Sequence, residues 1–352
     1  MEATNSWGPP DISSPGNTLE RHVALRQRRH PYATGELTGL FGQISLAAKI
    51  IQREVNRAGL AGSLGLTGAK NVQGEEVQKL DEFANATLEN CVGSGGHVCV
   101  MGSEERENPI IVPAESVGGK YVLLFDPLDG SGNIDINASI GTIFSIYRRK
   151  TETGPGKLED LLQPGRDLVA AGYVIYGSSC MLVYSAGEGV HGFTLDPAIG
   201  EFFLSHGDLK IPERGHFYSI NEGYSSLWDE ATRRWVRWIK STDPSTGRPY
   251  SLRYIGAMVA DLHRTLLRGG IFAYPGDSKH PNGKLRLLYE AAPMAFVVEA
   301  AGGLASSGES QIRDIVPDTL HQRTPLFIGS PRDVEDALNI IQESQDASTA
   351  TG

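Results

Sequence analysis

The sequence predicts a layered α/β protein with two fused subdomains, and three observations favour this fold class. Helical hydrophobic periodicity comes first, a run of short apolar segments typical of strands follows, and helices then alternate with strands toward the carboxyl end. The 352 residues, 40% hydrophobic and 21% charged, are enough to bury a substantial core. The order of the segments favours a layered sandwich over a barrel.

Two amino-terminal helices are predicted from apolar residues that recur at helical spacing within residues 37–55 and 77–91. The segment between them has glycine at every third position: Gly59, Gly62, Gly65 and Gly68. Because glycine removes side-chain restraint, this segment is either an ordinary connector or a mobile catalytic lid. The sequence leaves both interpretations open.

Short runs rich in β-branched and aromatic residues predict strands at residues 98–101, 121–126, 142–147, 169–176, 181–185 and 192–195. Beyond a boundary near His206, periodicity predicts helices at residues 226–241, 251–268, 284–301 and 332–343. Two short strands are predicted between these helices, at residues 270–274 and 326–328.

We therefore expect a disordered lead-in at residues 1–17, an amino-terminal subdomain at 18–205, a carboxyl-terminal subdomain at 206–341 and a disordered tail at 342–352. The lead-in lacks the basic start and apolar core of a secretory signal. No stretch approaches the roughly 18 to 20 consecutive apolar residues that cross a bilayer. We expect a soluble, cytoplasmic protein with no membrane partner.

Charge and cysteine usage narrow the function further. The net charge of −10 disfavours a nucleic-acid or anionic-membrane surface, so an anionic substrate must be held by local Lys and Arg side chains or by metal ions. Cys91, Cys99 and Cys180 follow neither a zinc-ribbon nor a CxxC spacing. We interpret them as core thiols in a reducing compartment, and no thiol regulation is expected.

The most informative segment runs from Phe125 to Asp135. Asp126 follows a predicted buried strand whose ladder Pro127 is expected to end, and Asp129 lies three residues further on. Two carboxylates at this spacing can share hard divalent cations such as Mg²⁺. The glycine-bearing stretch that follows would let backbone N–H groups and a hydroxyl approach a phosphate. The alternative interpretation is an Asp-Pro turn followed by an Asp-Gly hairpin.

The string from Asp126 to Ser131 resembles the metal motif of the lithium-sensitive, Mg²⁺-dependent sugar and inositol phosphatases. Further segments narrow the resemblance to class I fructose-1,6-bisphosphatase: Ser103–Glu105, Asn133–Asp135, Gly141–Phe144, Tyr218–Tyr224, Arg253–Tyr254 and Lys284–Glu290. The resemblance runs in order from about Thr34 to about Ser330. It implies an α-β-α-β-α sandwich of the sugar phosphatase type. It also implies hydrolysis of the 1-phosphate of D-fructose 1,6-bisphosphate to fructose 6-phosphate and phosphate, in gluconeogenesis or a sugar-phosphate cycle.

The resemblance implies two or three Mg²⁺ ions, with Mn²⁺ or Zn²⁺ as alternatives, bound by Glu104, Glu105, Asp126, the Leu128 carbonyl, Asp129 and Glu290. Without it, Glu104 and Glu105 are most simply solvated loop acids and Glu290 an exposed helix residue. The apolar neighbours of Glu290 nevertheless favour a cation. Asp81, otherwise an ordinary polar-face residue, would act with Glu105 to take the proton from the attacking water.

The resemblance also implies two sets of substrate contacts. One set lies in the motif: Asp129, Gly130, Ser131 and Gly132. The other would hold the second phosphate: Asn221, Tyr224, Arg253, Tyr254, Tyr274 and Lys284. Taken singly, each tyrosine is more simply a packing residue. Arg253 would reach a neighbouring subunit, which implies a homotetramer. Gly132 stands where the family usually has serine, but backbone N–H groups should preserve activity.

A regulatory site is implied by resemblance to the AMP-inhibition site of the family: Thr34, Gly35, Glu36, Leu37, Thr38, Lys120, Tyr121 and Arg148. A helix amino terminus and basic side chains would take the nucleotide phosphate. Upstream, residues 26–32 depart from the small-residue pattern of the family, and Pro31 would disturb a helix. The alternative is a basic segment at a subunit interface.

Three other functions are alternatives to this hydrolysis. Sedoheptulose 1,7-bisphosphate hydrolysis, alone or alongside, is an alternative because one extra hydroxylated carbon is a modest change for a pocket. A catalytically silent sugar-phosphate or AMP sensor is disfavoured because such a protein has no need for a complete set of metal-binding acids. Inositol-phosphate hydrolysis is disfavoured by the distal phosphate donors.

Overall fold

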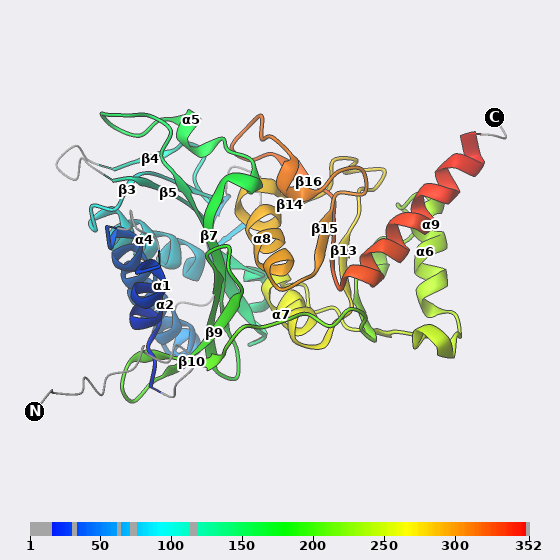
Figure 1. Cartoon of the computed structure of the whole chain (residues 1–352), viewed down its shortest axis with the longest axis horizontal. Coiled ribbons are helices and arrows are strands. Elements are labelled where there is room, and N and C mark those ends of the chain that lie inside the picture. The colour runs from blue at the N-terminus through cyan, green and yellow to red at the C-terminus, as the bar shows by residue number, and fades with distance from the viewer. Residues whose placement is uncertain (1–15, 30–33, 62–64, 71–75, 113–118, 350–352) are drawn as a thin grey trace, which may run out of the picture.

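The computed structural model describes residues 16–29, 34–61, 65–70, 76–112 and 119–349. It forms the predicted α-β-α-β-α sandwich (Figure 1). Amino-terminal helices cover one face of a large sheet, two helices lie between this sheet and a smaller one, and two further helices cover the outer face of the smaller sheet. Most of the expected lead-in and parts of the glycine-rich segment lie outside the described residues.

The first layer is helical. Its elements are α1 (Leu19–Gln27), α2 (Glu36–Val55), α3 (Ala58–Ala61) and α4 (Lys79–Gly93). The small hairpin of β1 (Leu66–Lys70) and β2 (Glu76–Gln78) precedes α4. The apolar stripes of α2 and α4 pack on the large sheet, as their periodicity predicted. Helix α1 was not predicted, because its buried face is narrow and includes His22.

In the described part of the chain the large sheet has eight strands, in the order β10-β9-β8-β7-β6-β5-β3-β4. Their bounds are β3 (Val98–Ser103), β4 (Ile110–Ile111), β5 (Tyr121–Asp129), β6 (Ile140–Arg148), β7 (Leu168–Tyr176), β8 (Cys180–Ser185), β9 (Val190–Asp196) and β10 (Glu201–His206). All neighbours are antiparallel except β3 and β5, which run parallel. Short helices lie in the connections: η2 (Ser131–Asn133), α5 (Leu158–Leu161) and η3 (Gly165–Asp167).

The smaller sheet has five strands within the described ranges, in the order β12-β11-β13-β17-β15. They are β11 (Phe217–Ser219), β12 (Ser251–Leu252), β13 (Ile271–Tyr274), β15 (Leu304–Ser306) and β17 (Leu326–Gly329). A separate pair is formed by β14 (Leu285–Arg286) and β16 (Arg323–Thr324). The helices of this half are η4 (Glu222–Tyr224), α6 (Glu230–Lys240), η5 (Pro244–Thr246), α7 (Met258–Arg268), the π-helical η6 (Leu287–Ala291), α8 (Ala292–Ala300), η7 (Ile312–Asp314) and α9 (Pro331–Thr349).

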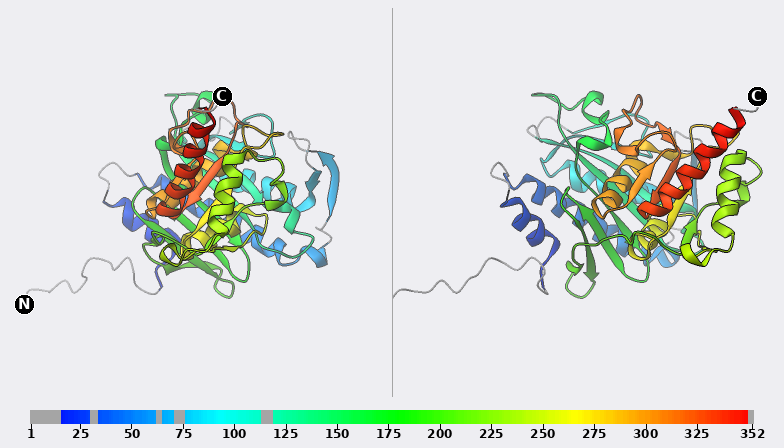
Figure 2. Two further views of the ribbon diagram at one scale, coloured as in Figure 1. Left: turned by 90° about the vertical axis from the view of Figure 1, so that its right-hand side faces the viewer. Right: turned by 45° about the vertical axis from the view of Figure 1, so that its right-hand side comes forward.

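The two sheets share one core layer. Helices α7 and α8 bury residues such as Leu262 and Val297 against both sheets, so the halves on either side of His206 are packed together. On the outer face, α6 and α9 cover the smaller sheet around Trp235, which is fully buried. Figure 2 shows these two helices side by side. A site between the halves is therefore held by packed elements on both sides.

Pro127 does not end β5, contrary to the sequence prediction. The strand continues to Asp129, and its register with β6 shifts between Asp126 and Asp129. An irregularity of this kind accommodates a residue without an N–H group inside a ladder. The carbonyl of Pro127 accepts a hydrogen bond from Thr142 Oγ1 at 2.8 Å. The bulge keeps both aspartates on a paired strand rather than on a free turn.

Three other boundaries differ from prediction. The expected helix at 251–268 is strand β12, an extended link and then α7. The expected helix at 284–301 begins with β14 and a π-helical turn before α8. Helix α9 continues to Thr349, so residues 342–349 are helical where we expected a disordered tail. In the described ranges, no helix has the length and hydrophobicity needed to cross a membrane.

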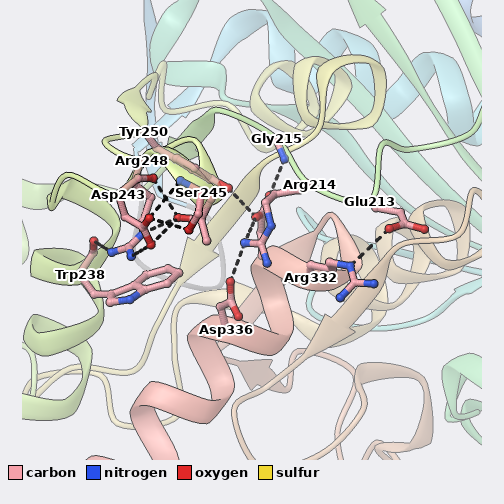
Figure 3. Close-up of polar contacts among 12 residues, drawn as sticks. Glu213, Arg214, Gly215, Trp238, Asp243, Ser245, Arg248, Tyr250, Arg332 and Asp336 are labelled. Atoms are coloured by element: carbon pink, nitrogen blue, oxygen red, sulfur yellow. Dashed lines mark hydrogen bonds and ion pairs between the residues drawn. The ribbon is translucent and has the colours of Figure 1, made fainter.

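A buried carboxylate ties α9 to the smaller sheet (Figure 3). Asp333 accepts hydrogen bonds from the Gly215 N–H at 2.8 Å, the Tyr250 hydroxyl at 2.8 Å and Arg214 Nη1 at 3.2 Å. Arg214 also contacts Asp336 at 2.6 Å. The segments before β11 and β12 are thus fixed to the first turn of α9.

We predict that Asp333→Ala lowers the free energy of unfolding by about 2–3 kcal/mol, because it leaves buried donors without an acceptor. Urea unfolding followed by fluorescence measures the effect. Asp336→Ala is the matched control, since Asp336 is partly exposed, and it should cost less than about 1 kcal/mol. Equal losses in the two variants would contradict the role given to Asp333.

Candidate metal and substrate site

The parallel pairing of β3 and β5 brings acids from both strands to one edge of the large sheet. Ser103 pairs with Phe125, so Glu104 follows β3 at the level where Asp126 lies in β5. The Glu104 N–H donates to the Phe125 carbonyl at 3.1 Å. One carboxylate oxygen from each of Glu104, Asp126 and Glu290 lies within 4.8 Å of the other two. All three side chains are buried.

Glu290 reaches this cluster because of the π-helical turn before α8. Its Oε2 accepts a hydrogen bond from the Arg286 N–H at 2.6 Å, which fixes the carboxylate at the start of η6. Tyr289 and Ala291 on either side are fully buried. The exposed-face interpretation of Glu290 is therefore wrong, and its burial among apolar neighbours favours a cation beside it.

Arg286 is a site residue to which sequence reasoning gave no role. Its Nη1 lies 3.0 Å from Glu104 Oε1, and its backbone N–H binds Glu290. A basic residue four positions before Glu290 in an apolar run was the available signal. Arg286 thus lies against the cluster, and three buried carboxylates gathered at one point suit divalent cations with oxygen ligands. Burial of Asp126, and next the negative charges of Glu104 and Asp129, raise its pKa well above the usual range.

Asp129 joins the cluster to helix α7. Its two oxygens accept hydrogen bonds from the Met258 and Val259 N–H groups, at 3.1 and 2.7 Å. Burial raises the pKa of Asp129 to about 7, although these two bonds act in the opposite direction. The following Gly130 has φ 77° and faces Ala257 so closely that a Cβ at residue 130 would lie 2.4 Å from the alanine methyl. Only glycine fits there.

Asp81 lies at the start of α4, where its carboxylate accepts a hydrogen bond from the Gln78 N–H at 3.2 Å. Burial, and next the charge of Glu105, raise its pKa to about 7, while a hydrogen bond from Ser131 opposes the shift. Glu105 is half-buried, and its N–H donates to Ser103 Oγ at 3.2 Å. The structure thus places Asp81 beside both Glu105 and the glycine turn.

The remaining motif residues line the approach to these acids. Leu128 is buried, and its N–H donates to Asp126 Oδ1 at 3.0 Å. Gly132 is exposed, with open space where a Cβ would stand, so the missing serine of the family leaves no gap in packing. Asn133 is buried and its side-chain amide donates to the Ile255 carbonyl at 3.1 Å. Further along, Asp135 Oδ1 accepts from the Gly65 N–H at 3.3 Å.

Several of the residues predicted to hold the second phosphate lie beside the smaller sheet. Lys284 Nζ lies 4.4 Å from the centre of the Tyr224 ring. Burial raises the pKa of Tyr254 to about 12, with a hydrogen bond to Asn221 opposing the shift. Burial also raises the pKa of Tyr274, and the nearby groups that add to it include Tyr254, Tyr224 and Glu290. Tyr274 thus lies between the distal donors and the acidic cluster.

Arg253 is placed differently from the other donors. It is exposed directly after edge strand β12, and its Nη1 donates to the carbonyl of Leu252 at 2.8 Å. Its guanidinium carbon lies 5.8 Å from the centre of the Phe217 ring. Its exposure leaves the guanidinium accessible to another molecule.

The residues of the suggested AMP site also come together. Lys120 Nζ lies 2.6 Å from Glu36 Oε1 in the first turn of α2, and Arg148 stacks over Tyr121 at 4.8 Å on the neighbouring strand. Gly35 caps α2 with φ 84°. A cavity of about 470 Å³ beside this contact is lined by residues that include Lys120, Arg148 and Arg149. Pro31, which bears on this site, lies outside the described residues.

Comparison with known proteins finds similarity along nearly the whole chain. Residues 17–207 match the family model for the fructose-1-6-bisphosphatase N-terminal domain, and residues 211–342 match that for the C-terminal domain. A curated relative from Chloroherpeton thalassium, named fructose-1,6-bisphosphatase class 1, is 57% identical over 330 residues, which is 94% of each chain. One of the same name from Maridesulfovibrio salexigens is 55% identical over 93% of this chain and 98% of its own. The holo crystal structure of Leishmania major fructose-1,6-bisphosphatase has a TM-score of 0.87 at 42% identity, covering 93% of this chain and 99% of that one.

Divalent metal should stabilise the fold more strongly at high pH. The pKa values of Asp81 and Asp129 are raised from 3.8 to about 7, so the folded protein binds more protons than the unfolded chain between those values. The protonated forms of these two groups contribute to the free energy of unfolding at low pH. That contribution is lost as the pH rises to about 7 unless a cation replaces the proton. We predict that saturating Mg²⁺ raises Tm more at about pH 8 than at about pH 5.5.

The matched pair Glu290→Gln and Glu107→Gln separates cluster binding from general salt effects, since Glu107 is exposed on the loop after Glu104. Only Glu290→Gln should reduce the Mg²⁺-induced shift. The same shift at both pH values, or in both variants, would contradict metal binding by the cluster.

Proposed function

Because this chain belongs to the class 1 fructose-1,6-bisphosphatase family, we propose that it hydrolyses the 1-phosphate of D-fructose 1,6-bisphosphate to fructose 6-phosphate and phosphate. The observation that carries this assignment is the convergence of Glu104, Asp126 and Glu290, with one oxygen of each within 4.8 Å of the others. The glycine turn 130–132 lies beside this cluster and leaves room for a phosphate. The reaction belongs to gluconeogenesis or a sugar-phosphate cycle in the cytoplasm.

The carboxylates fit divalent cations better than any other ligand class. They are buried and crowded, with one oxygen of each within 4.8 Å of the others. The proposed ligands for two or three Mg²⁺ ions are Glu104, Glu105, Asp126, the Leu128 carbonyl, Asp129 and Glu290. When bound, such ions lower the pKa of a coordinated water and stabilise the charge on the transferring phosphate. Carboxylate ligands also accept Mn²⁺, and Zn²⁺ is a further alternative.

Side chains of the chain itself position the reactants. Asp81, with a pKa of about 7, holds or releases a proton near neutral pH, and Glu105 beside it can share that role. Ser131 and the backbone of Gly130 and Gly132 face the proposed phosphate position. Hydrogen bonds from the N–H groups of α7 fix Asp129, which would hold the turn at one distance from bound ions.

The distal phosphate requires donors away from the metals. We assign this role to Asn221, Tyr224, Tyr254, Tyr274 and Lys284, together with Arg253 of a neighbouring subunit. The exposure of Arg253 on an edge strand supports a contribution across an interface, and hence a homotetramer. The same pocket could admit sedoheptulose 1,7-bisphosphate, which remains the alternative substrate.

AMP is proposed as an inhibitor that binds at the start of α2. The pairing of Lys120 with Glu36 and the position of Arg148 over Tyr121 support this site. A helix amino terminus flanked by two cations suits a nucleotide phosphate. Thr34, Gly35, Leu37 and Thr38 would complete it.

The function is tested by phosphate release from fructose 1,6-bisphosphate, sedoheptulose 1,7-bisphosphate and inositol 1-phosphate, with Mg²⁺ or excess EDTA. We predict chelator-sensitive turnover of the fructose substrate. Glu290→Gln should lower kcat about 100-fold or more because it removes a metal ligand, whereas Glu107→Gln should leave kcat unchanged. Greater turnover of the sedoheptulose substrate would reassign the enzyme, and no turnover of any substrate would favour the silent sensor.

Inhibition by AMP gives a separate prediction. Arg148→Ala should raise the AMP concentration for half-inhibition about tenfold, since one charge-assisted phosphate contact is lost, with kcat in the absence of AMP unchanged. Lys150→Ala, at an exposed position two residues away, is the control and should keep normal inhibition. A wild-type enzyme insensitive to AMP would instead support the subunit-interface interpretation.

A further inference from the structure

The link between β12 and α7 carries two of the proposed distal phosphate donors. Arg253 and Tyr254 lie at its start, and the link ends at Ala257, directly before the N–H groups of Met258 and Val259 that hold Asp129. Ile255 is exposed and no strand continues past Leu252. The geometry of this short segment therefore sets how far Tyr254 lies from the acidic cluster and where Arg253 is presented to a neighbouring subunit.

Two residues of α7 hold the link through its backbone. Asp261 is fully buried, and its Oδ2 accepts a hydrogen bond from the Ile255 N–H at 3.2 Å. Arg264 Nη2 donates both to the Arg253 carbonyl and to Asp261 Oδ1, each at 3.0 Å. The pair thus fixes the backbone on both sides of Tyr254. We call Asp261 and Arg264 the α7 clamp.

Other contacts hold the ends of the same link. Upstream, the Tyr250 hydroxyl is bound to Asp333 at 2.8 Å (Figure 3). Downstream, Asn133, directly after the glycine turn 130–132, donates to the Ile255 carbonyl at 3.1 Å, and Ala257 packs against Gly130. Between these ends, the clamp contacts the residues that carry the donors. Asp261 and Arg264 form an ion pair three residues apart on one helix, and their contacts with the backbone of the link distinguish this pair from an ordinary pair within a helix.

We propose that Asp261 and Arg264 are positioning residues that hold Tyr254 at a fixed distance from the metal cluster and present Arg253 to the neighbouring subunit. The inference rests on the proposed function, because it assumes that these donors bind the distal phosphate. A bisphosphate presents two anions at a limited range of separations. Donors already ordered at that separation bind it without the entropy cost of ordering the link.

The test compares two substrates in the Arg264→Ala variant. Arg264 is partly exposed, with 26% of its side chain accessible, so its truncation leaves no buried cavity. For fructose 1,6-bisphosphate with Mg²⁺, kcat/KM should fall about tenfold, mainly through KM, because a charged hydrogen-bond donor to the link is lost. For fructose 1-phosphate, which lacks the distal phosphate, kcat/KM should stay within about twofold of wild type.

Arg268→Ala, at an exposed position in the last turn of the same helix, is the matched control and should behave as wild type. Arg264→Lys, which keeps one donor group, should give an intermediate KM. An equal loss with both substrates would show that Arg264 acts through α7 and Asp129, and would overturn the inference. Unchanged kinetics with both substrates would overturn it as well.

Amide hydrogen exchange tests the clamp independently of turnover. The Ile255 N–H should exchange faster in Arg264→Ala than in wild type or Arg268→Ala, because its acceptor Asp261 loses its own partner. Equal exchange in all three proteins would contradict the clamp. Absence of wild-type activity on fructose 1,6-bisphosphate would count against the proposed function, while this measurement would still decide whether the clamp exists.

Discussion

Burial of several carboxylates in one small volume is the constraint on which the rest of the structure depends. Glu104, Asp126 and Glu290 lie with ligand atoms within 4.8 Å of one another, and Asp129 and Asp81 lie close enough to influence the same charge balance. Such a group is costly unless protons or cations neutralise it. The surrounding elements supply part of this compensation through Arg286 and the N–H groups of α7. We propose that divalent cations complete it.

The architecture places these acids where both sheets can contribute. Parallel pairing of β3 with β5 aligns Glu104 and Asp126, and the shifted register at Pro127 keeps Asp129 on the same strand. Helix α7 belongs to the layer shared by the two sheets, and its first turn binds Asp129. The distal donors lie on the smaller sheet and its connections. In the proposed function, substrate would bridge these two packed halves, and the layer between them would determine the separation of its two phosphate sites.

The long periodic elements could be predicted from the sequence because their burial follows local patterning. Helix α2 and strand β7 appear close to their expected bounds. The acids of the metal motif stood out because their spacing brings oxygen ligands together on one edge. Contacts that form only in the tertiary fold could not be predicted from local patterning. The π-helical turn that buries Glu290, the bulge at Pro127 and the role of Arg286 each depend on partners distant in sequence.

The central claim is that this buried acidic cluster binds divalent cations beside the glycine turn 130–132. It is tested most directly by anomalous diffraction from crystals soaked in Mn²⁺ together with fructose 6-phosphate and phosphate. The account predicts anomalous peaks in contact with carboxylate oxygens of Glu104, Asp126 and Glu290, and phosphate density next to Gly130. An acidic cluster without an anomalous peak, its charge offset by Arg286 and bound protons alone, would contradict it.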